Sequence, residues 1–326
     1  MRFLVTGGAG YIGSMTTRAL LDAGHTCLVL DTLERGYRDA VDERAQFVEG
    51  SIADSSVLDA ALPGCDAVIH LAGYIEVAES VEQPVRYFRA NATEPTAMLE
   101  VMRKHGVGAI VFSSTAAVYG EPDSVPILED APKRPVNPYG ASKLAFEDAL
   151  DEAGQAWGLR SVRFRYFNVA GAWPDGSMGE NHHPETHIIP RVLTAMRDGQ
   201  RRFEVYGDDY PTPDGTCVRD YIHVLDLATA HRLGLERAGR GGPGGVFNLG
   251  NGRGYSNLEV VGTCARVSGR EVEIAMGPRR AGDPAVLVAS AERAREELGW
   301  EPERGELTTI VGDAWRWHLE HPDGYR

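Results

Sequence analysis

The segment VTGGAGYIG, residues 5–13, constrains the fold of this chain more than any other feature. It directly follows a short apolar run that starts at residue 2, and it opens an amphipathic stretch. Gly7, Gly10 and Gly13 have the spacing that brings a backbone turn against a pyrophosphate and packs a helix closely on a strand. The free N–H groups at the start of such a helix attract anions. The sequence therefore predicts a dinucleotide site at this first connection.

Strand-like runs alternate with amphipathic helical stretches up to about residue 167. The strand-like runs have few polar interruptions, as in strands that are covered on both faces, and they span residues 2–6, 27–31, 45–50, 66–72, 108–114 and 160–167. This alternation predicts an α/β fold with a Rossmann-type, doubly wound parallel sheet.

From residue 168 onward Gly, Pro, Asn and His become frequent, and the expected elements become shorter. This change predicts a smaller α/β substrate-binding lobe beside the main sheet. We expect residues 1–170 plus about 222–250 to form the dinucleotide-binding domain. Residues of about 171–221 plus 251–326 are expected to form the lobe.

Charge and cysteine content narrow the choice of partners and compartment. The net charge of −14 argues against binding to nucleic acid or to an anionic membrane, since both require a basic face. The four cysteines show no C-x-x-C pattern, which favours reduced thiols. No apolar run approaches 18 residues, and the first strand leaves no room for a signal peptide. We expect a cytoplasmic protein.

Asp31 indicates which dinucleotide binds. It ends the second predicted strand, 18 residues after Gly13, where an acid accepts hydrogen bonds from the adenosine ribose. A carboxylate there repels a 2′-phosphate, so the sequence favours NAD over NADP. Arg35 lies nearby and leaves NADP open, and a turn-capping role for Asp31 is the alternative.

The segment PVNPYGASK, residues 135–143, places Tyr139 four residues before Lys143. Pro138 is suited to a first helical turn, so a helix is predicted to begin near Asn137, with Tyr139 and Lys143 on one face. A nearby ammonium lowers the pKa of a phenol, and a tyrosine shifted toward neutrality can exchange a proton with a secondary alcohol. An ordinary helix start with no chemical role is the alternative.

The segment FSSTAAVYG, residues 112–120, follows a predicted strand and carries hydroxyls to the ligand-binding edge of the sheet. Thr115 is placed to hydrogen-bond the same substrate hydroxyl as Tyr139. For Ser113 and Ser114 the simpler interpretation is a turn in which the hydroxyls satisfy backbone groups.

The segments TGGAGYIG, FSSTAAVYG, NPYGASK, RYFNVAGA and DYPTPDGTCVRDYIHVLDLA together resemble the extended short-chain dehydrogenase/reductase family, and within it the UDP-glucose 4-epimerases. The resemblance implies that Tyr139 is the catalytic base, with Lys143 as its electrostatic partner and Thr115 beside it. It implies transient oxidation of a UDP-sugar at C4 by bound NAD. Sugar-nucleotide dehydratases carry an acid pair after the threonine, whereas this chain has Ala116 and Ala117, so elimination of water is not expected.

The resemblance also implies two sets of ligand contacts. Those to NAD are Gly7, Gly10, Tyr11, Ile12, Gly13, Asp31, Ser51, Ile52, Leu71, Ala72, Asn91, Ser113, Tyr139, Lys143 and Tyr166. Those to the UDP-sugar are Thr115, Tyr139, Asn168, His187, Ile188, Tyr206, Arg219, Arg280, Asp283 and Val286.

The chain departs from the family pattern at several positions. Ser51 stands where an Asp usually meets the adenine amine, Glu94 and Pro95 replace a Gly-Thr pair, and HLAGYIEVAES lacks a lysine near the cofactor phosphates. In the family a small residue near Val286 admits N-acetyl sugars, which raises UDP-GlcNAc as an alternative substrate.

Three histidines, His182, His183 and His187, raise the question of a metal. We expect none, because no acidic or cysteine partner stands at ligand spacing and the family needs no metal. A homodimer is expected by resemblance, through helices around 85–104 and 140–157. An NAD-sensing regulator and a net dehydrogenase are the functional alternatives.

Overall fold

The computed structural model describes residues 1–200, 202–279 and 283–325. Arg280, one of the expected phosphate-binding residues, lies outside these ranges. No helix within them is long and apolar enough to cross a lipid bilayer.

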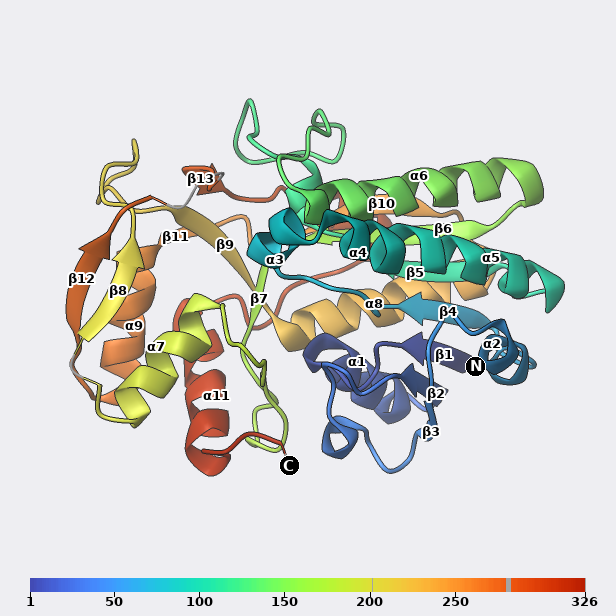
Figure 1. The fold of residues 1–326 in the computed structure, drawn as a ribbon, viewed down its shortest axis with the longest axis horizontal. Helices are drawn as coiled ribbons and strands as arrows, with labels where there is room; N and C mark the ends of the chain where they lie inside the picture. Colours follow the sequence, from blue (N-terminus) through green and yellow to red (C-terminus); the bar gives the residue numbers. More distant parts are fainter. Residues whose placement is uncertain (201, 280–282, 326) are drawn as a thin grey trace.

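The largest element of the fold is a seven-stranded sheet with the order β10-β6-β5-β4-β1-β2-β3. All its neighbouring strands pair in parallel. The strands are β1 (Arg2–Thr6), β2 (Thr26–Asp31), β3 (Gln46–Glu49), β4 (Ala67–His70), β5 (Ala109–Ser113), β6 (Arg160–Tyr166) and β10 (Gly245–Leu249). The predicted Rossmann-type α/β fold is confirmed (Figure 1).

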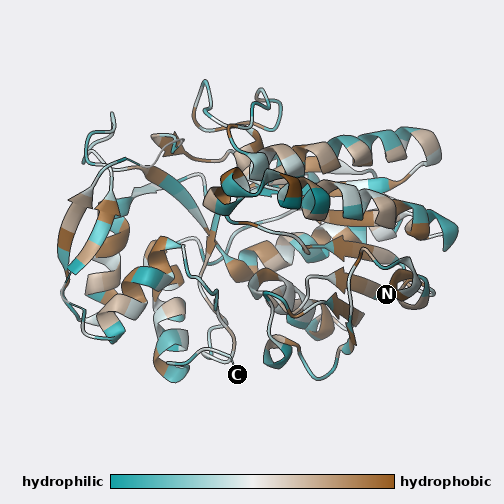
Figure 2. Cartoon of the chain, viewed as in Figure 1, coloured by the Kyte–Doolittle hydropathy of each residue, from teal (hydrophilic) through white to brown (hydrophobic). Residues whose placement is uncertain are grey.

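Helices cover both faces of this sheet. One face packs against α2 (Ser55–Ala61), α5 (Glu94–Lys104) and α6 (Pro138–Trp157) through an apolar core that includes Leu58, Met98 and Phe146. The other face packs against α1 (Tyr11–Asp22) and α8 (Val224–Gly239). The strands are mostly hydrophobic and the outer helix faces are mostly hydrophilic, as Figure 2 shows. Two covered faces explain why the strands read as apolar runs.

The helix expected around residues 85–104 is interrupted in the structure. It consists of α4 (Pro84–Phe88), a π-helical turn (Arg89–Thr93) and α5, with the short α3 (Val77–Glu82) before it. Pro84 stands at the start of α4 and Pro95 at the start of α5, and each lacks an N–H for the preceding turn. Two 3₁₀ turns follow strands of the sheet, Arg38–Ala40 after β2 and Ala116–Val118 after β5.

A second group of elements forms a smaller lobe, at the left of Figure 1. Its main sheet joins β7 (Asn168–Ala170), β9 (Val218–His223), β11 (Gly254–Ser256) and β13 (Val286–Leu287), and β8 (Arg202–Tyr206) pairs with β12 (Glu273–Gly277). Three helices, α7 (Ile188–Arg197), α9 (Asn257–Ser268) and α11 (Leu307–Glu320), pack around an apolar core of their own.

The chain passes between the two parts more than once. After β9, α8 and β10 return to the main sheet, and α10 (Glu292–Leu298) also contacts α8 and β10. Ala294 and Trp300 belong to the core on the α8 side of the main sheet. The exact domain boundaries stay a prediction.

A buried ion pair joins α6 to β6 beside the centre of the sheet. Arg165 and Glu147, whose side chains are 3% and 1% exposed, make two hydrogen bonds of 2.9 and 2.5 Å. Ser114 donates a third hydrogen bond to the same carboxylate. A buried charge that loses its partner is strongly destabilising, whereas the intact pair is nearly neutral against apolar packing.

Glu147→Gln should therefore lower the free energy of unfolding by about 3–5 kcal/mol, because Arg165 is left buried without a counter-charge. Urea unfolding monitored by circular dichroism measures the change. Glu152→Gln, on an exposed position of the same helix, is the control and should stay within about 0.5 kcal/mol of the parent. An equal effect of both variants would contradict this role for the ion pair.

Candidate active site

The glycine turn between β1 and α1 has no room for side chains at two of its positions. Gly7 has a φ of +74°, and a Cβ there would lie 2.5 Å from the backbone nitrogen of Ala72. A Cβ on Gly13 would lie 2.1 Å from the carbonyl oxygen of Gly7. The N-cap of α1 is Gly10, and no side-chain hydrogen bond from the described residues caps the helix there, which leaves its first N–H groups available to an anion. These residues fit a dinucleotide pyrophosphate.

Asp31 lies beside this turn at the end of β2. Its carboxylate accepts hydrogen bonds from the backbone N–H groups of Ala9, at 3.0 Å, and of Leu33, at 2.9 Å. The turn-capping alternative is therefore realised, and the same group also holds the glycine turn. Each carboxylate oxygen keeps a further lone pair, which is what a ribose hydroxyl needs.

The other residues expected at the adenine end lie after β3 and β4. Ser51 Oγ accepts a hydrogen bond of 3.1 Å from the N–H of Ala53, and Ile52 is buried. The N–H groups of Leu71 and Ala72 both donate to the carbonyl of Thr6. These four residues thus stand along the same edge of the sheet as Gly7.

Asn91 has a structural role that the sequence did not reveal. Its side-chain oxygen accepts from the N–H of Tyr74, and its amide group donates to the Tyr74 carbonyl and to Ser142 Oγ. A Cβ on Gly73 would lie 2.5 Å from that side-chain oxygen. Asn91 therefore fixes the loop after β4 against α6, and its expected contact with NAD stays a prediction.

The start of α6 brings together the three residues expected to carry the chemistry. Asn137 caps the helix by accepting a 2.9 Å hydrogen bond from Gly140, which confirms the predicted helix start. A Cβ on Gly140 would lie 2.5 Å from the carbonyl oxygen of Ala117, so α6 lies close to the turn that follows Thr115. Thr115 lies close enough to Tyr139 for its hydroxyl to lower the pKa of the phenol.

Lys143 is buried one helical turn after Tyr139. Its Nζ donates a 3.2 Å hydrogen bond to the carbonyl of Ser113 and lies 5.1 Å from the centre of the Phe112 ring. Burial lowers the pKa of Lys143 to about 8. The ammonium is thus held at the carboxyl end of β5 rather than in solvent.

The pKa of Tyr139 differs from the sequence expectation. We expected Lys143 to lower it toward neutrality, but in the structure burial raises the pKa, Thr115 lowers it, and the charge of Glu76 raises it. The physical reason is that burial removes a phenolate from water, and this costs more free energy than the neighbouring groups in this chain supply by interacting with it. The prediction that Tyr139 and Lys143 lie one turn apart at the start of a helix is confirmed. The predicted direction of the Tyr139 pKa shift was wrong.

The hydroxyls of Ser113 and Ser114 bond to side chains and not to the backbone groups expected from the sequence. Ser114 Oγ donates to Glu147, and Ser113 Oγ lies 2.9 Å from Nε2 of His231. His231 Nδ1 lies 2.9 Å from the carbonyl of Leu227, which can only accept, so Nε2 accepts the proton of Ser113. Tyr166 stands next to Ser113, at the end of β6.

The expected UDP-binding residues lie on several elements of the lobe. Arg219 on β9 forms a 3.4 Å ion pair with Asp283, and Val286 begins β13, which pairs with β9. Asn168, on β7, pairs with Tyr221 of β9 in the sheet of the lobe. The structure also places Tyr206 at the end of β8, and His187 and Ile188 at the start of α7. Arg219 and Asp283 are thus brought together, and the complete pocket stays a prediction.

The sequence analysis was wrong about the histidine partners. Glu180 and Glu185 lie with His182 and His187 so closely that one potential ligand atom from each falls within 4.8 Å of the others. The pattern Glu-x-His-x-x-Glu-x-His in residues 180–187 is the sequence signal that could have revealed these partners. Although burial lowers it, Glu180 and Glu185 raise the pKa of His182 to about 9.

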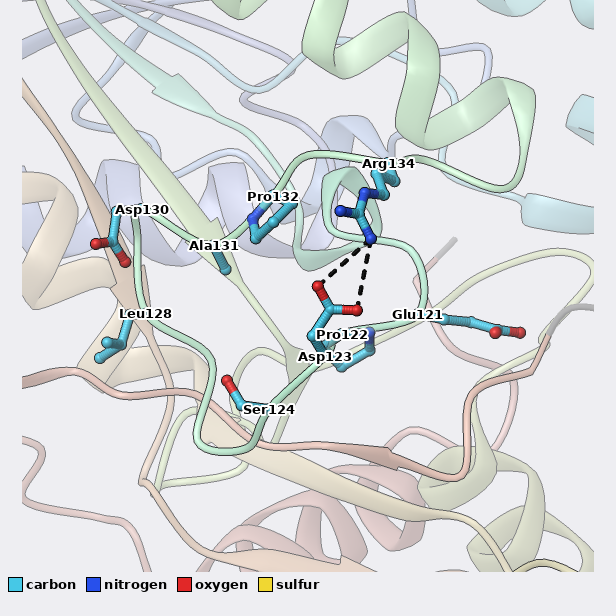
Figure 3. A pocket seen from close by; sticks show the side chains of 9 residues that line it. All are labelled: Glu121, Pro122, Asp123, Ser124, Leu128, Asp130, Ala131, Pro132 and Arg134. Atoms are coloured by element: carbon cyan, nitrogen blue, oxygen red, sulfur yellow. Dashed lines mark hydrogen bonds and ion pairs between the residues drawn. The ribbon is translucent and has the colours of Figure 1, made fainter.

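A separate pocket of about 230 Å³ lies in the loop between the 3₁₀ turn at Ala116–Val118 and α6 (Figure 3). Its walls include Leu128, Asp130 and Pro132, and Arg134 forms an ion pair with Asp123 at 3.4 Å. It contains none of the expected site residues. The glycine turn and Tyr139, not this pocket, define the candidate active site.

Comparison with known proteins agrees with this arrangement. The sequence profile of the NAD dependent epimerase/dehydratase family matches residues 3–250. The UDP-glucose 4-epimerase of Lacticaseibacillus casei is 50% identical over 327 residues, which cover 100% of this chain and 99% of that protein.

Two solved structures of UDP-glucose 4-epimerases are also similar to this chain. The NAD complex of UDP-glucose 4-epimerase from Brucella ovis has a TM-score of 0.93 and 44% identity, over 97% of this chain and 98% of that one. The enzyme from Bifidobacterium longum, with NAD+ and UDP, has a TM-score of 0.94 and 36% identity over 100% of both chains. The chain therefore belongs to the NAD dependent epimerase/dehydratase family and, within it, to the UDP-glucose 4-epimerase group.

His231 should make the stability of the protein depend on pH. Burial lowers its pKa to about 4, below the value of about 6.5 in an unfolded chain. The unfolded state therefore binds more protons between these values, and the free energy of unfolding falls as pH drops from 6.5 toward 4, by at most about 1.4 kcal/mol per unit.

Urea unfolding at several pH values between 4 and 7 tests this expectation. His231→Gln should flatten the slope, whereas His183→Gln, at an exposed position, should leave the slope unchanged. If the His231 variant kept the same slope of unfolding free energy against pH, buried neutral His231 would not be a source of the acid sensitivity.

Proposed function

We propose that this protein is a UDP-glucose 4-epimerase, an isomerase that interconverts UDP-galactose and UDP-glucose. The reaction is a transient oxidation at sugar C4 with bound NAD, and Tyr139 is the base. The observation that carries the proposal is the close placement of Tyr139 and Thr115, one turn from buried Lys143 and at the same sheet edge as the glycine turn.

NAD, when bound, accepts a hydride from C4 and returns it. The chain supplies the proton chemistry. Tyr139 takes the proton of the sugar 4-hydroxyl and later gives it back, while Thr115 holds the oxygen that changes between hydroxyl and ketone. A positively charged group near Tyr139 favours its phenolate form, which opposes the effect of burial.

Lys143 serves this proton exchange by position. Its ammonium is anchored on the Ser113 carbonyl, at 3.2 Å, and lies one turn beyond the phenol. Ser113 is itself held by His231, so the hydroxyl-bearing end of β5 is supported from α8. Arg219 offers a guanidinium fork suited to a diphosphate oxygen pair, and Asp283 orients that fork. Held by its diphosphate, the 4-keto sugar is free to turn and present its other face.

Incubation of the purified protein with UDP-galactose, without added NAD, should yield UDP-glucose with no net NADH. Tyr139→Phe should lower kcat by about 10²–10⁴-fold, because the proton acceptor is removed. Nucleotide-sugar chromatography and absorbance of NADH give the two readouts.

Tyr255→Phe, a change at a buried tyrosine in the core of the lobe, is the matched control and should keep the parent activity. Stoichiometric release of NADH would indicate a dehydrogenase instead. Failure to convert any UDP-hexose with or without NAD would leave the regulator alternative, for which the comparisons give no support.

Acceptance of N-acetyl sugars is a finer proposal that depends on Val286. This small, partly buried residue begins β13 next to β9, the strand that carries Arg219. A bulky side chain at Val286 would fill space near the sugar. Val286→Tyr should therefore lower kcat/KM for UDP-GlcNAc at least about tenfold more than for UDP-glucose.

The comparison requires initial rates with both sugars for the parent and the variant. Leu287→Tyr is not a suitable control because Leu287 packs in a core cluster, whereas Val125→Tyr changes an exposed valine. An equal loss of kcat/KM for both sugars in the Val286 variant would contradict the proposed role of Val286 in selecting the sugar.

A homodimer and a cytoplasmic location are also proposals. The exposed apolar side chains Val81, Val85 and Phe88 on α3 and α4 support a subunit contact on this side of the molecule. The four free, buried cysteines are typical of a reducing compartment. The net charge of −14 supports the absence of nucleic acid and membrane partners.

A further inference from the structure

Four side chains in the segment before α7 point their polar atoms at one another. Oε1 of Glu180 lies 2.8 Å from Nδ1 of His187 and 3.1 Å from Nδ1 of His182. The carboxylate of Glu185 lies 3.3 Å from His187 Nδ1 and 3.6 Å from His182 Nδ1. One atom from each of the four residues lies within 4.8 Å of the others.

These contacts do not satisfy the atoms that make them. Glu180 is only 5% exposed, and its Oε1 is buried without a hydrogen-bond partner among the described residues. The Nδ1 atoms of His182 and His187 are also buried without a hydrogen-bond partner in the part of the chain that the structure describes, although they lie 3.1 and 2.8 Å from that oxygen. Buried polar atoms that converge without hydrogen-bond geometry need another partner.

A divalent cation meets the geometric and electrostatic needs of the cluster. The two carboxylates carry a charge of −2, and each imidazole supplies a nitrogen ligand once a cation has displaced the proton from its Nδ1. Zinc takes four such nitrogen and oxygen ligands in a tetrahedron at about 2.0–2.1 Å, which puts neighbouring ligand atoms about 3.3–3.4 Å apart. The four carboxylate–imidazole separations, 2.8–3.6 Å, span that value, and all four ligand atoms lie within 4.8 Å of one another.

We propose that Glu180, His182, Glu185 and His187 bind one Zn²⁺ ion in a structural site. Four protein ligands leave no open position for water or substrate, so the ion has no catalytic role. The ion itself takes no part in the proposed epimerase reaction, although its ligand His187 is also one of the residues expected to contact the UDP-sugar. The proposal concerns how the segment of residues 180–187 is held.

The position of the cluster indicates what the ion stabilises. The ring of His182 packs edge-on against Tyr11 of α1, with 6.3 Å between ring centroids. Tyr11 in turn donates a 2.7 Å hydrogen bond to the carbonyl of Gly171. Within the same segment, Thr186 donates to Glu76, and the carbonyl of His183 accepts from Arg35.

The ion therefore fixes residues 180–187, which form a strap between α1 and the lobe. At the far end of this strap, His187 is the N-cap of α7, and Ile188 is its first residue. A fixed strap sets the place of α7 relative to α1. Loss of the ion should loosen this connection and leave the residues of β1 and β5 in place.

Metal content of the unmodified protein is the direct test. Protein without a polyhistidine tag, exposed to Zn²⁺ and then dialysed against buffer, should hold about one zinc per chain by mass spectrometry of metals. After removal of zinc with a chelator, Co²⁺ should give the visible absorption of a tetrahedral site. Zinc should raise Tm relative to the chelator-treated protein. No retained zinc, or no effect of zinc on Tm, would overturn the proposal.

Two variants separate this site from other zinc-binding groups. His182→Gln should weaken zinc binding by more than the roughly 10–100-fold that loss of an outer partner costs, because a ligand is removed. His183→Gln changes an adjacent histidine outside the cluster and should bind zinc like the parent. Equal zinc binding by both variants would exclude the site. These readouts do not require epimerase activity, so they stand or fall apart from the proposed function.

Discussion

The close contact of the β1–α1 turn with the end of β4 is the constraint on which the rest of the site depends. Gly7 and Gly13 allow backbone atoms to approach to distances that no side chain would permit. This contact aligns the start of α1 with the carboxyl edge of the parallel sheet, where β4 and β5 also end. An anion-binding helix end and the Tyr139 hydroxyl can therefore serve one ligand.

Buried polar pairs behind this edge hold the reactive groups in place. His231 on α8 supports Ser113 from one face of the sheet, and Lys143 on α6 reaches the same residue from the other. The ion pair of Arg165 with Glu147 joins β6 to α6 just below. Such pairs are costly to break once buried, so they give α6 a single position relative to the sheet.

Sequence patterns were most reliable where one local rule determined the structure. The cap at Asn137 and the strand runs of the main sheet follow from local chemistry, and both are confirmed. The direction of the Tyr139 pKa shift was wrong because burial depends on every element packed around the phenol. The partners of His182 were missed because their carboxylates converge only through the path of the folded segment.

By itself, the sequence determined the parallel α/β sheet, the glycine turn and the spacing of Tyr139 and Lys143, since each depends on residues that are neighbours along the chain or on a repeating apolar pattern. The tertiary structure alone decided which distant groups meet. It placed Arg219 against Asp283, Glu180 against two histidines, and Ser113 against His231. The reason is that burial and electrostatic interaction depend on distances in space, which the order of residues does not specify.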